Sequence, residues 1–300
     1  MNANVSYAPR RAPESERHTL RGLDYHVTRW RAVADTAGSP LVLLHGWMDT
    51  GATFQFLVDE LPVTWSCAAP DWRGFGRTSW APGGYWFPDY FADLDRLLDL
   101  LCPGEPATLI GHSMGGNVVL AYAGLRPRRV RRVVCIEGFG LARTQPGQAP
   151  DRVRRWLDEL REEPAFARFA SFDALAAHLQ RKNPRLDPAR ARFIASAWAR
   201  ENEDGSWQMR SDPAHKRVNP VLYRREESES CWRAIEAPVL YVVAADSPHL
   251  AALGEDATVT RMSSLIRTLE PCTIAAAGHM VHHDQPAALA AQIDAFLSRT

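Results

Sequence analysis

The stretch Leu109-Ile110-Gly111-His112-Ser113-Met114-Gly115-Gly116 decides how the rest of this chain is interpreted. The apolar run that ends at Ile110 is typical of a buried strand, and residues 117–125 are typical of a helix. Between them, Gly-x-Ser-x-Gly predicts a sharp strand-to-helix turn. Such a turn holds the Ser113 hydroxyl above a sheet, at a helix N-terminus that favours developing negative charge. Ser113 is therefore a candidate nucleophile.

The composition indicates a folded protein with a sizeable core. The chain has 300 residues, of which 46% are hydrophobic, enough for one large α/β domain with an insertion. Lys plus Arg and Asp plus Glu each number 35, so nothing in the charge balance predicts binding to nucleic acid. No apolar run approaches the length of a membrane span. Residues 1–16 lack an apolar core, so we expect a disordered leader and not a secretory signal.

Cysteine and histidine patterns predict neither disulfides nor a bound metal. The five cysteines are an odd number without metal-like spacing, so we infer a reducing environment and expect a cytoplasmic protein. The only close grouping of histidines with a carboxylate, His282-His283-Asp284, lies at a predicted helix start and is expected at the surface. A three-glycine dinucleotide fingerprint is also missing from the sequence. We therefore expect no metal and no cofactor.

Alternating strand and helix patterns predict a mostly parallel sheet flanked by helices. Strand-like apolar runs occur at 41–44, 65–70, 107–110, 133–136, 238–243 and 268–275. From about residue 138 to residue 236 this pattern almost disappears, and helical stretches replace it. We therefore divide the chain into the leader, a core formed by residues 17–138 and 237–300, and a helical cap, residues 139–236, inserted before the penultimate strand region.

A serine hydroxyl is too weakly acidic to attack a carbonyl unaided, so it needs a general base, which in turn needs an orienting acid. His279 follows a predicted strand through the small-residue turn Ala277-Gly278 and precedes a helix. Its loop can therefore reach back over the sheet to Ser113. Other histidines lie nearby, but only His279 follows the turn directly, and we predict it as the base.

Acyl transfer also needs two backbone N–H groups directed at the developing oxyanion. One is expected from Met114, the residue after the nucleophile, and the other from the loop His45-Gly46-Trp47 that follows the strand 41–44. Gly46 permits the backbone to turn its amides inward, so the second donor is assigned to Trp47. His45 is expected to hold this loop by hydrogen bonds.

Several motifs occur here in the order found in the α/β-hydrolase superfamily. They are His45-Gly46-Trp47, the stretch 71–79, the turn 111–116, and Gly278-His279 followed by Asp284 and Pro286. Over about residues 20–298 the chain resembles that superfamily and, within it, the capped serine hydrolase-like proteins related to epoxide hydrolases and haloalkane dehalogenases. The last two groups use an aspartate nucleophile where this chain has Ser113. The resemblance therefore implies an α/β-hydrolase fold and acyl transfer to water through an acyl-serine intermediate.

Two carboxylates compete for the role of the acid. In most of the superfamily the acid follows the strand that corresponds to residues 239–243 and directly precedes a proline. That place holds Ser247 here, and Asp246 stands one position earlier. Glu137 ends the strand 133–136, where some family members carry their acid. Both candidates keep the chain order serine, acid, histidine and lie at C-terminal strand ends. The usual position of the acid in the family favours Asp246, whereas the longer side chain favours Glu137.

Aromatic side chains suggest the class of substrate. Trp and Phe are abundant in the predicted cap and in the loops expected to face it, and Trp47 and Phe139 are candidate lining residues of an apolar pocket. We therefore expect an esterase-type serine hydrolase that acts on a small, apolar acyl substrate. The sequence leaves open cleavage of a C–C bond, a lactone or a thioester with the same residues, or a non-catalytic binding protein on a hydrolase scaffold. The oligomeric state is also open.

Overall fold

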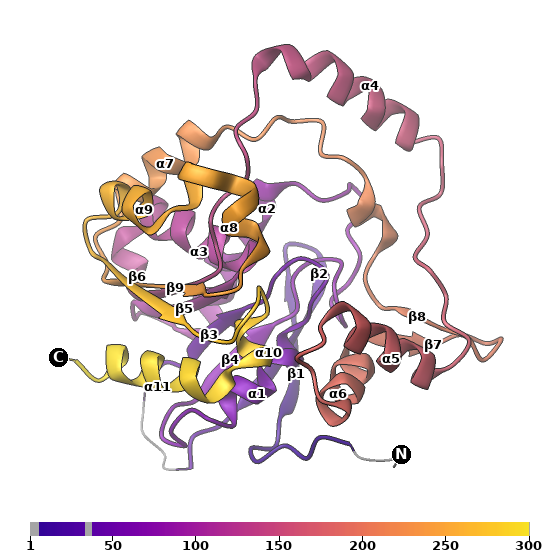
Figure 1. Ribbon diagram of the computed structural model, residues 1–300, viewed down its shortest axis with the longest axis horizontal. Helices are drawn as coiled ribbons and strands as arrows, with labels where there is room; N and C mark the ends of the chain where they lie inside the picture. Colours follow the sequence, from indigo (N-terminus) through magenta and orange to yellow (C-terminus); the bar gives the residue numbers. More distant parts are fainter. Residues whose placement is uncertain (1–5, 34–37, 300) are drawn as a thin grey trace.

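A computed structural model describes residues 6–33 and 38–299, and an eight-stranded sheet lies at its centre (Figure 1). The strands, in spatial order, are β1 (Glu14–Leu20), β2 (Leu23–Trp30), β4 (Cys67–Pro70), β3 (Leu41–Leu44), β5 (Ala107–His112), β6 (Val130–Ile136), β9 (Val239–Ala244) and β10 (Leu269–Ile274). Strand β2 pairs antiparallel with both β1 and β4, and every other pair in the sheet is parallel. The predicted mostly parallel α/β fold is confirmed.

Helices cover both faces of the sheet (Figure 1). They are α1 (Gln55–Val58), α2 (Phe87–Leu101), α3 (Met114–Leu125), α7 (Arg225–Arg233), α8 (Pro248–Leu253), α9 (Val259–Leu265), α10 (Val281–Asp284) and α11 (Pro286–Leu297), with short 3₁₀ turns η1 (Gly51–Phe54), η2 (Pro127–Arg129) and η5 (Gly254–Ala257). Successive residues of β3 point to opposite faces, since Val42 packs with α2 and α3 whereas Leu43 packs with α1 and α11. The sheet is thus buried on both sides, which explains the continuous apolar runs of its strands.

The segment between β6 and β9 carries the additional helices α4 (Ala149–Glu159), α5 (Phe172–Lys182) and α6 (Pro188–Trp198), the hairpin of β7 (Ala199–Glu201) and β8 (Trp207–Met209), and the turns η3 (Pro146–Gln148) and η4 (Pro213–Lys216). Helices α5 and α6 form a small core together with Phe56 of α1, and Leu175 and Ile194 are buried in it. Helix α4 has no buried residue and stands apart from this pair (Figure 1). Helix α7, by contrast, packs against α3 of the core. We therefore keep the cap as a proposal, but end it before α7 and not at residue 236.

The described part of the expected leader is ordered by hydrogen bonds, so the prediction of disorder is wrong there. Arg11 is only 8% exposed, and its backbone N–H donates to Asp59 Oδ1 at 2.8 Å. Its guanidinium donates to the carbonyl of Trp65 at 2.8 Å, and strand β1 already begins at Glu14. The ring of Tyr7 also packs against that of Phe56 at 4.8 Å, so the segment is held in place although it has no apolar core of its own. Residues 1–5 lie outside the described residues.

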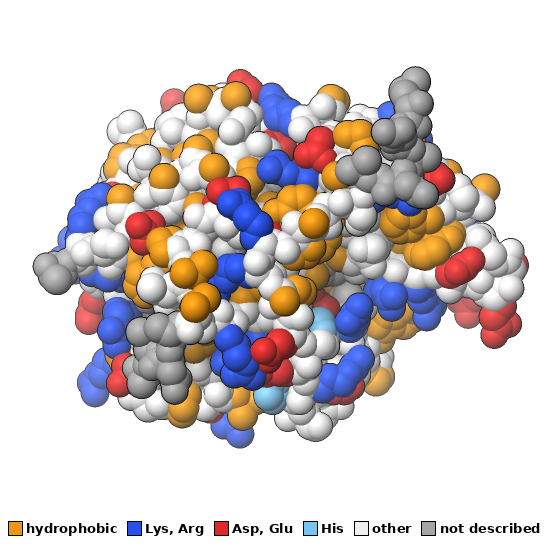
Figure 2. All heavy atoms as spheres, turned by 90° about the horizontal axis from the view of Figure 1, so that it is seen from below, with side chains coloured by type: hydrophobic (Ala, Val, Ile, Leu, Met, Phe, Trp, Pro, Cys, Tyr) orange, Lys and Arg blue, Asp and Glu red, His pale blue; other side chains and the backbone are white. Residues whose placement is uncertain are grey.

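The surface is mixed in charge. On the face drawn in Figure 2, Lys and Arg side chains lie among Asp, Glu and apolar ones, as expected from equal numbers of basic and acidic residues. Within residues 6–33 and 38–299, no helix combines the length and the apolar character needed to cross a bilayer.

Candidate active site

Ser113 occupies the tight turn between β5 and α3. Its φ of 51° lies in the left-handed region, which a non-glycine residue adopts only where its surroundings hold it there. The Ser113 N–H donates to the carbonyl of Ile136 at 2.8 Å. The flanking glycines are required by space: a Cβ on Gly111 would lie 2.4 Å from the carbonyl oxygen of Gly115, and one on Gly115 would lie 2.0 Å from that of Leu44. The turn therefore has the shape expected of a nucleophile elbow.

Three side chains far apart in the sequence form a continuous chain of hydrogen bonds. His279 lies in the loop between β10 and α10, and its Nε2 is 2.9 Å from Ser113 Oγ. The other ring nitrogen, Nδ1, is 3.2 Å from Oε2 of Glu137, which directly follows β6. If Nδ1 carries the proton and donates to the carboxylate, Nε2 is free to accept from the Ser113 hydroxyl. The arrangement can therefore withdraw a proton from Ser113.

Glu137 is held by further donors. It is 2% exposed, and the backbone N–H of Ala244 donates to its Oε1 at 2.7 Å. Its Oε2 accepts from the hydroxyl of Ser247 as well as facing His279. A φ of 55° shows that Glu137, like Ser113, takes a left-handed backbone conformation. Donors on both oxygens fix the carboxylate toward His279.

Asp246, the other candidate acid, lies on the surface. Its side chain is 52% exposed, and its Oδ2 accepts from the Arg185 guanidinium at 2.7 Å, with no hydrogen bond to His279 among the described residues. The preference drawn from family frequency is therefore not supported by this geometry. Ser247 stands at the usual place of the acid and donates to Glu137 instead. In the sequence, the position of Ser247 before Pro248 marks the usual place of the acid, but it does not predict that Ser247 donates a hydrogen bond to Glu137.

The loop that follows β3 lies directly against the nucleophile. A Cβ on Gly46 would come 3.1 Å from Ser113 Cβ, so the peptide group that joins Gly46 to Trp47 stands beside the elbow. His45 holds this loop as expected, because its Nε2 accepts from the Trp72 backbone N–H at 2.8 Å while its Nδ1 contacts the Gly46 carbonyl at 2.7 Å. Met114 is the first residue of α3, so its N–H has no carbonyl partner within the helix. Both predicted donors thus border Ser113.

The two predicted lining residues have different surroundings. Trp47 is 54% exposed and belongs to the loop that lies against the elbow at Gly46. Phe139 is 2% exposed and packs in the main core, with its ring 6.1 Å from that of Tyr241. A ring without free surface is not able to contact a substrate, so the structure corrects the expectation for Phe139.

Two histidines beside His279 were missed as neighbours of the site. The buried His112, inside the elbow motif, lies with its Nε2 2.8 Å from the backbone carbonyl of His279. Burial, assisted by His282 and His279, lowers the pKa of His112 well below its ordinary value, so the ring is neutral and donates this hydrogen bond. The His249 ring lies 4.2 Å from that of His279 in an edge-to-face arrangement. Burial, assisted by the neighbouring His279, lowers the pKa of His249 as well.

His282 and His283 are buried, which corrects the expectation that they lie at the surface. Cap helix α6 covers them, since Arg190 donates to the backbone carbonyl of His283 at 2.8 Å. Trp198, at the end of the same helix, donates to Asp49 Oδ1 at 2.8 Å. The surface expectation is wrong because the sequence does not reveal that α6 lies over α10.

Comparison with known proteins agrees with the observed fold. The family described as "alpha/beta hydrolase fold" matches residues 39–286. A serine hydrolase-like protein of Danio rerio is 28% identical over 268 residues, which cover 87% of this chain and 82% of that protein. The 2-(acetamidomethylene)succinate hydrolase of Mesorhizobium japonicum is 27% identical over 255 residues, which cover 85% of this chain and 86% of that protein.

Solved structures extend the likeness over nearly the whole chain. The thioesterase domain from the curacin biosynthetic pathway superposes with a TM-score of 0.83 at 23% identity, covering 95% of this chain and 99% of that one. The structure of E-2-(acetamidomethylene)succinate hydrolase gives a TM-score of 0.76 at 21% identity and covers 96% of this chain and all (100%) of that one. At these identities the likeness shows the fold alone. The resemblance inferred from the motifs and the expected hydrolase class are confirmed by the family match, and the chain belongs to the α/β-hydrolase fold family.

Proposed function

We propose that this protein is a serine hydrolase that cleaves a carboxylic ester or a related acyl substrate through an acyl-serine intermediate. Ser113 is the nucleophile, His279 the general base and Glu137 the acid that orients the base. The observation that carries the proposal is the hydrogen-bonded chain from Ser113 Oγ through His279 to Glu137 Oε2, with distances of 2.9 Å and 3.2 Å. Such a chain supplies both the proton acceptor and the charge that a weakly acidic hydroxyl needs.

The acylation step follows from these contacts. His279 Nε2 removes the hydroxyl proton while Ser113 Oγ bonds to the acyl carbon, and the carbonyl electron pair moves onto its oxygen. The backbone N–H groups of Met114 and Trp47 hold this oxyanion, and the Glu137 carboxylate stabilises the imidazolium. The C–O bond to the leaving alcohol then breaks, and the alcohol takes the proton from Nε2.

Deacylation repeats these roles with water. A water molecule gives one proton to His279 Nε2 as its oxygen attacks the acyl carbon. The second tetrahedral intermediate breaks its bond to Ser113 Oγ, which recovers the proton. The products are one carboxylic acid and one alcohol, and no redox partner is needed.

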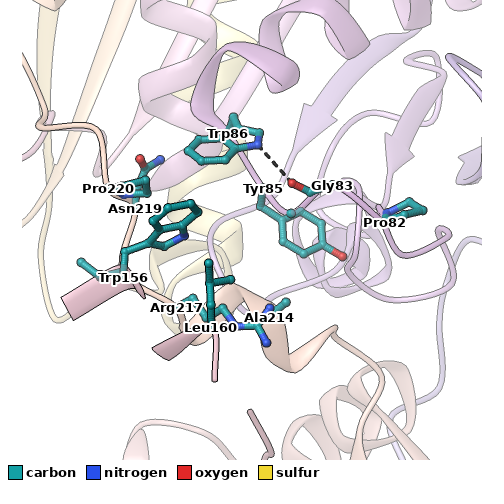
Figure 3. A pocket seen from close by; sticks show the side chains of 12 residues that line it. Pro82, Gly83, Tyr85, Trp86, Trp156, Leu160, Ala214, Arg217, Asn219 and Pro220 are labelled. Atoms are coloured by element: carbon teal, nitrogen blue, oxygen red, sulfur yellow. Dashed lines mark hydrogen bonds between the residues drawn. The ribbon is translucent and has the colours of Figure 1, made fainter. Parts of the chain in front are cut away.

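We propose an apolar acyl group from the aromatic surroundings. Trp47 is exposed beside the elbow. Exposed aromatic side chains near a site favour apolar ligands. A separate pocket of about 180 Å³, between the loop 82–86 and helix α4, has Trp86 and Trp156 in its wall, but Ser113, His279 and Glu137 do not line it (Figure 3). Turnover of p-nitrophenyl esters from acetyl to octanoyl, with a monosuccinyl ester added, tests this point: the medium-chain esters should be preferred, and better turnover of the short or charged esters would overturn the apolar assignment alone.

The nucleophile itself is tested by covalent labelling. A fluorophosphonate probe reacts with activated serines, and mass spectrometry of the digested protein locates the adduct. We expect the adduct on Ser113 in the wild type and none in the Ser113→Ala variant. A wild-type protein that is folded by circular dichroism and stays unlabelled would contradict the hydrolase proposal and favour a binding protein on this scaffold.

A further inference from the structure

We propose that Asp49, His282 and His283 form a binding site for a divalent transition-metal ion of the Zn²⁺ class, separate from the Ser113–His279–Glu137 chain. Each residue offers one ligand atom, and these atoms all lie within 4.8 Å of one another. Two imidazole nitrogens and one carboxylate oxygen are ligands that Zn²⁺ takes in proteins. Nothing in the proposed hydrolase mechanism uses these three side chains.

The polar atoms of this cluster are buried without ordinary partners. Within the described residues, Asp49 Oδ2, both ring nitrogens of His282 and Nε2 of His283 have no hydrogen bond, although all three residues are buried. Buried polar atoms in proteins nearly always have a partner. One such atom from each of the three residues lies in the cluster and indicates a shared partner, because a cation satisfies a carboxylate and two imidazoles at once.

The carboxylate of Asp49 is held in a fixed orientation. Its Oδ1 accepts from the Thr50 backbone N–H at 2.8 Å, the Thr53 hydroxyl at 2.7 Å and the Trp198 indole at 2.8 Å. These donors occupy Oδ1 and leave Oδ2 directed at His282. Hydrogen bonds that orient a ligand in this way are a regular feature of metal sites.

The separation between Asp49 and His282 suits a shared ion. Asp49 Oδ2 lies 3.4 Å from His282 Nε2. Zn–N and Zn–O bonds of about 2.0–2.2 Å at a tetrahedral angle place two ligand atoms about 3.4 Å apart. The same separation is long for a direct charge-assisted hydrogen bond, which is about 2.7–2.9 Å.

Aromatic packing and the cap restrict the site. The His282 ring lies 4.9 Å from that of Phe54, and the His283 ring lies 5.8 Å from that of Phe56, so both imidazoles are packed in place. Helix α6 closes the site through Trp198, as described above. An ion therefore enters when α6 moves away or while the chain folds, and slow binding is expected.

The experiment measures metal binding directly and does not depend on catalysis. Tag-free protein is treated with a chelator and titrated with Co²⁺, whose visible absorption reports tetrahedral coordination, and Zn²⁺ binding is measured by equilibrium dialysis. We expect one ion per chain, a rise in Tm with Zn²⁺, and loss of the Co²⁺ spectrum in His283→Gln. Trp198→Phe keeps the ligands but removes a donor to Asp49, and it should weaken Zn²⁺ binding by about 10–100-fold.

The matched control is His18→Gln, which removes a partly exposed histidine that also contacts a carboxylate, Glu16. This variant should bind Zn²⁺ like the wild type. Absence of stoichiometric binding by the wild type, or equal Zn²⁺ binding by the wild type and His283→Gln, would overturn the proposal. Labelling of Ser113 is measured in a separate experiment, so the metal-binding result neither supports nor contradicts the hydrolase proposal.

Discussion

The hydroxyl of Ser247 donates a hydrogen bond to Oε2 of Glu137, the same oxygen that lies 3.2 Å from His279 Nδ1. Ser247 stands after β9, where most of the superfamily carries its acid, whereas Glu137 stands after the neighbouring strand β6. These strands pair in parallel, with Ile136 opposite Val242, so their carboxyl ends deliver side chains to the same place. We infer that Glu137 supplies the acid from β6 and that Ser247 supports it from the usual position.

Removing the Ser247 hydroxyl should reduce turnover modestly. In Ser247→Ala, Glu137 keeps its place but loses one donor, and a hydrogen bond worth about 0.5–1.5 kcal/mol corresponds to about a 2–10-fold fall in kcat with little change in KM. Steady-state kinetics on one ester measures this. Ser264→Ala removes an exposed hydroxyl that bonds only to its own helix, and it is the control expected to match the wild type. An unchanged kcat in Ser247→Ala would mean that Glu137 does not need this donor.

A methyl group on Gly46 should damage the oxyanion loop. In Gly46→Ala the added carbon would stand 2.9 Å from His112 Nδ1 and 3.1 Å from Ser113 Cβ, so the loop must shift away from the nucleophile. Loss of one oxyanion donor costs about 10²–10³-fold in kcat, and we expect a loss of this order. Gly147→Ala, where the added carbon meets nothing within 4 Å, is the matched control. Comparable kinetics for the two variants would show that this loop does not position a donor.

His112 should act as a positioning residue that does not titrate. Its pKa lies well below the ordinary value because the ring is buried, so the ring stays neutral at neutral pH. His112→Phe keeps a ring but removes the donor to the His279 carbonyl, and we expect about 1–3 kcal/mol of lost stability with a lower kcat. The kcat/KM of both proteins should rise with pH along curves of the same shape. A shifted midpoint in the variant would contradict the neutral state of His112.

Asp71 should contribute stability that depends on pH. Burial opposes its charged form, but the hydrogen bond from His26, at 2.9 Å, and the backbone N–H of Arg77 hold the pKa of Asp71 below its ordinary value. A carboxyl with a lowered folded pKa stabilises the fold above its unfolded pKa of about 3.9, and this stabilisation is lost as the pH falls toward the folded pKa. Asp71→Asn should therefore cost about 1–3 kcal/mol at neutral pH and less in acid.

Urea unfolding at neutral pH and at a pH below the unfolded pKa of about 3.9 measures the Asp71 effect. The exposed Asp158 gives the matched control, since its side chain is 75% exposed and its contact with Arg161 is long, at 4.0 Å. We expect Asp158→Asn to unfold like the wild type at both pH values. A loss of unfolding free energy in Asp71→Asn that is larger in acid than at neutral pH would contradict a lowered pKa of Asp71 in the folded protein.

Local patterns predicted the parts of the site that depend on nearby residues. The elbow around Ser113 and the loop of His279 are defined by short glycine-containing motifs at strand ends, and the structure places these two side chains 2.9 Å apart. The choice of acid depends instead on which side chain turns inward at adjacent strand ends. Glu137 turns toward His279 through a left-handed backbone, and Asp246 turns outward to Arg185. Neither orientation has a signature in the sequence.

Burial by distant segments was equally hard to predict. The pair His282-His283 has a polar, helix-start sequence, yet α6 from the cap covers it, so the cluster with Asp49 became visible only in three dimensions. Phe139 lies two positions after the candidate acid Glu137 and is predicted from the sequence to line the substrate pocket, but it packs into the core instead. Tertiary contacts decide both positions, and periodicity within a single element does not report them.

The comparison of Glu137→Gln with Asp246→Asn tests the central claim most directly, because each change removes one charge and keeps the shape of the side chain. With a medium-chain p-nitrophenyl ester, we predict that Glu137→Gln lowers kcat/KM by about 10²–10⁴-fold. Asp246→Asn should stay within about twofold of the wild type, since an exposed ion pair such as that with Arg185 contributes little. A large loss in Asp246→Asn together with a nearly unchanged Glu137→Gln would contradict the assignment of Glu137 as the acid.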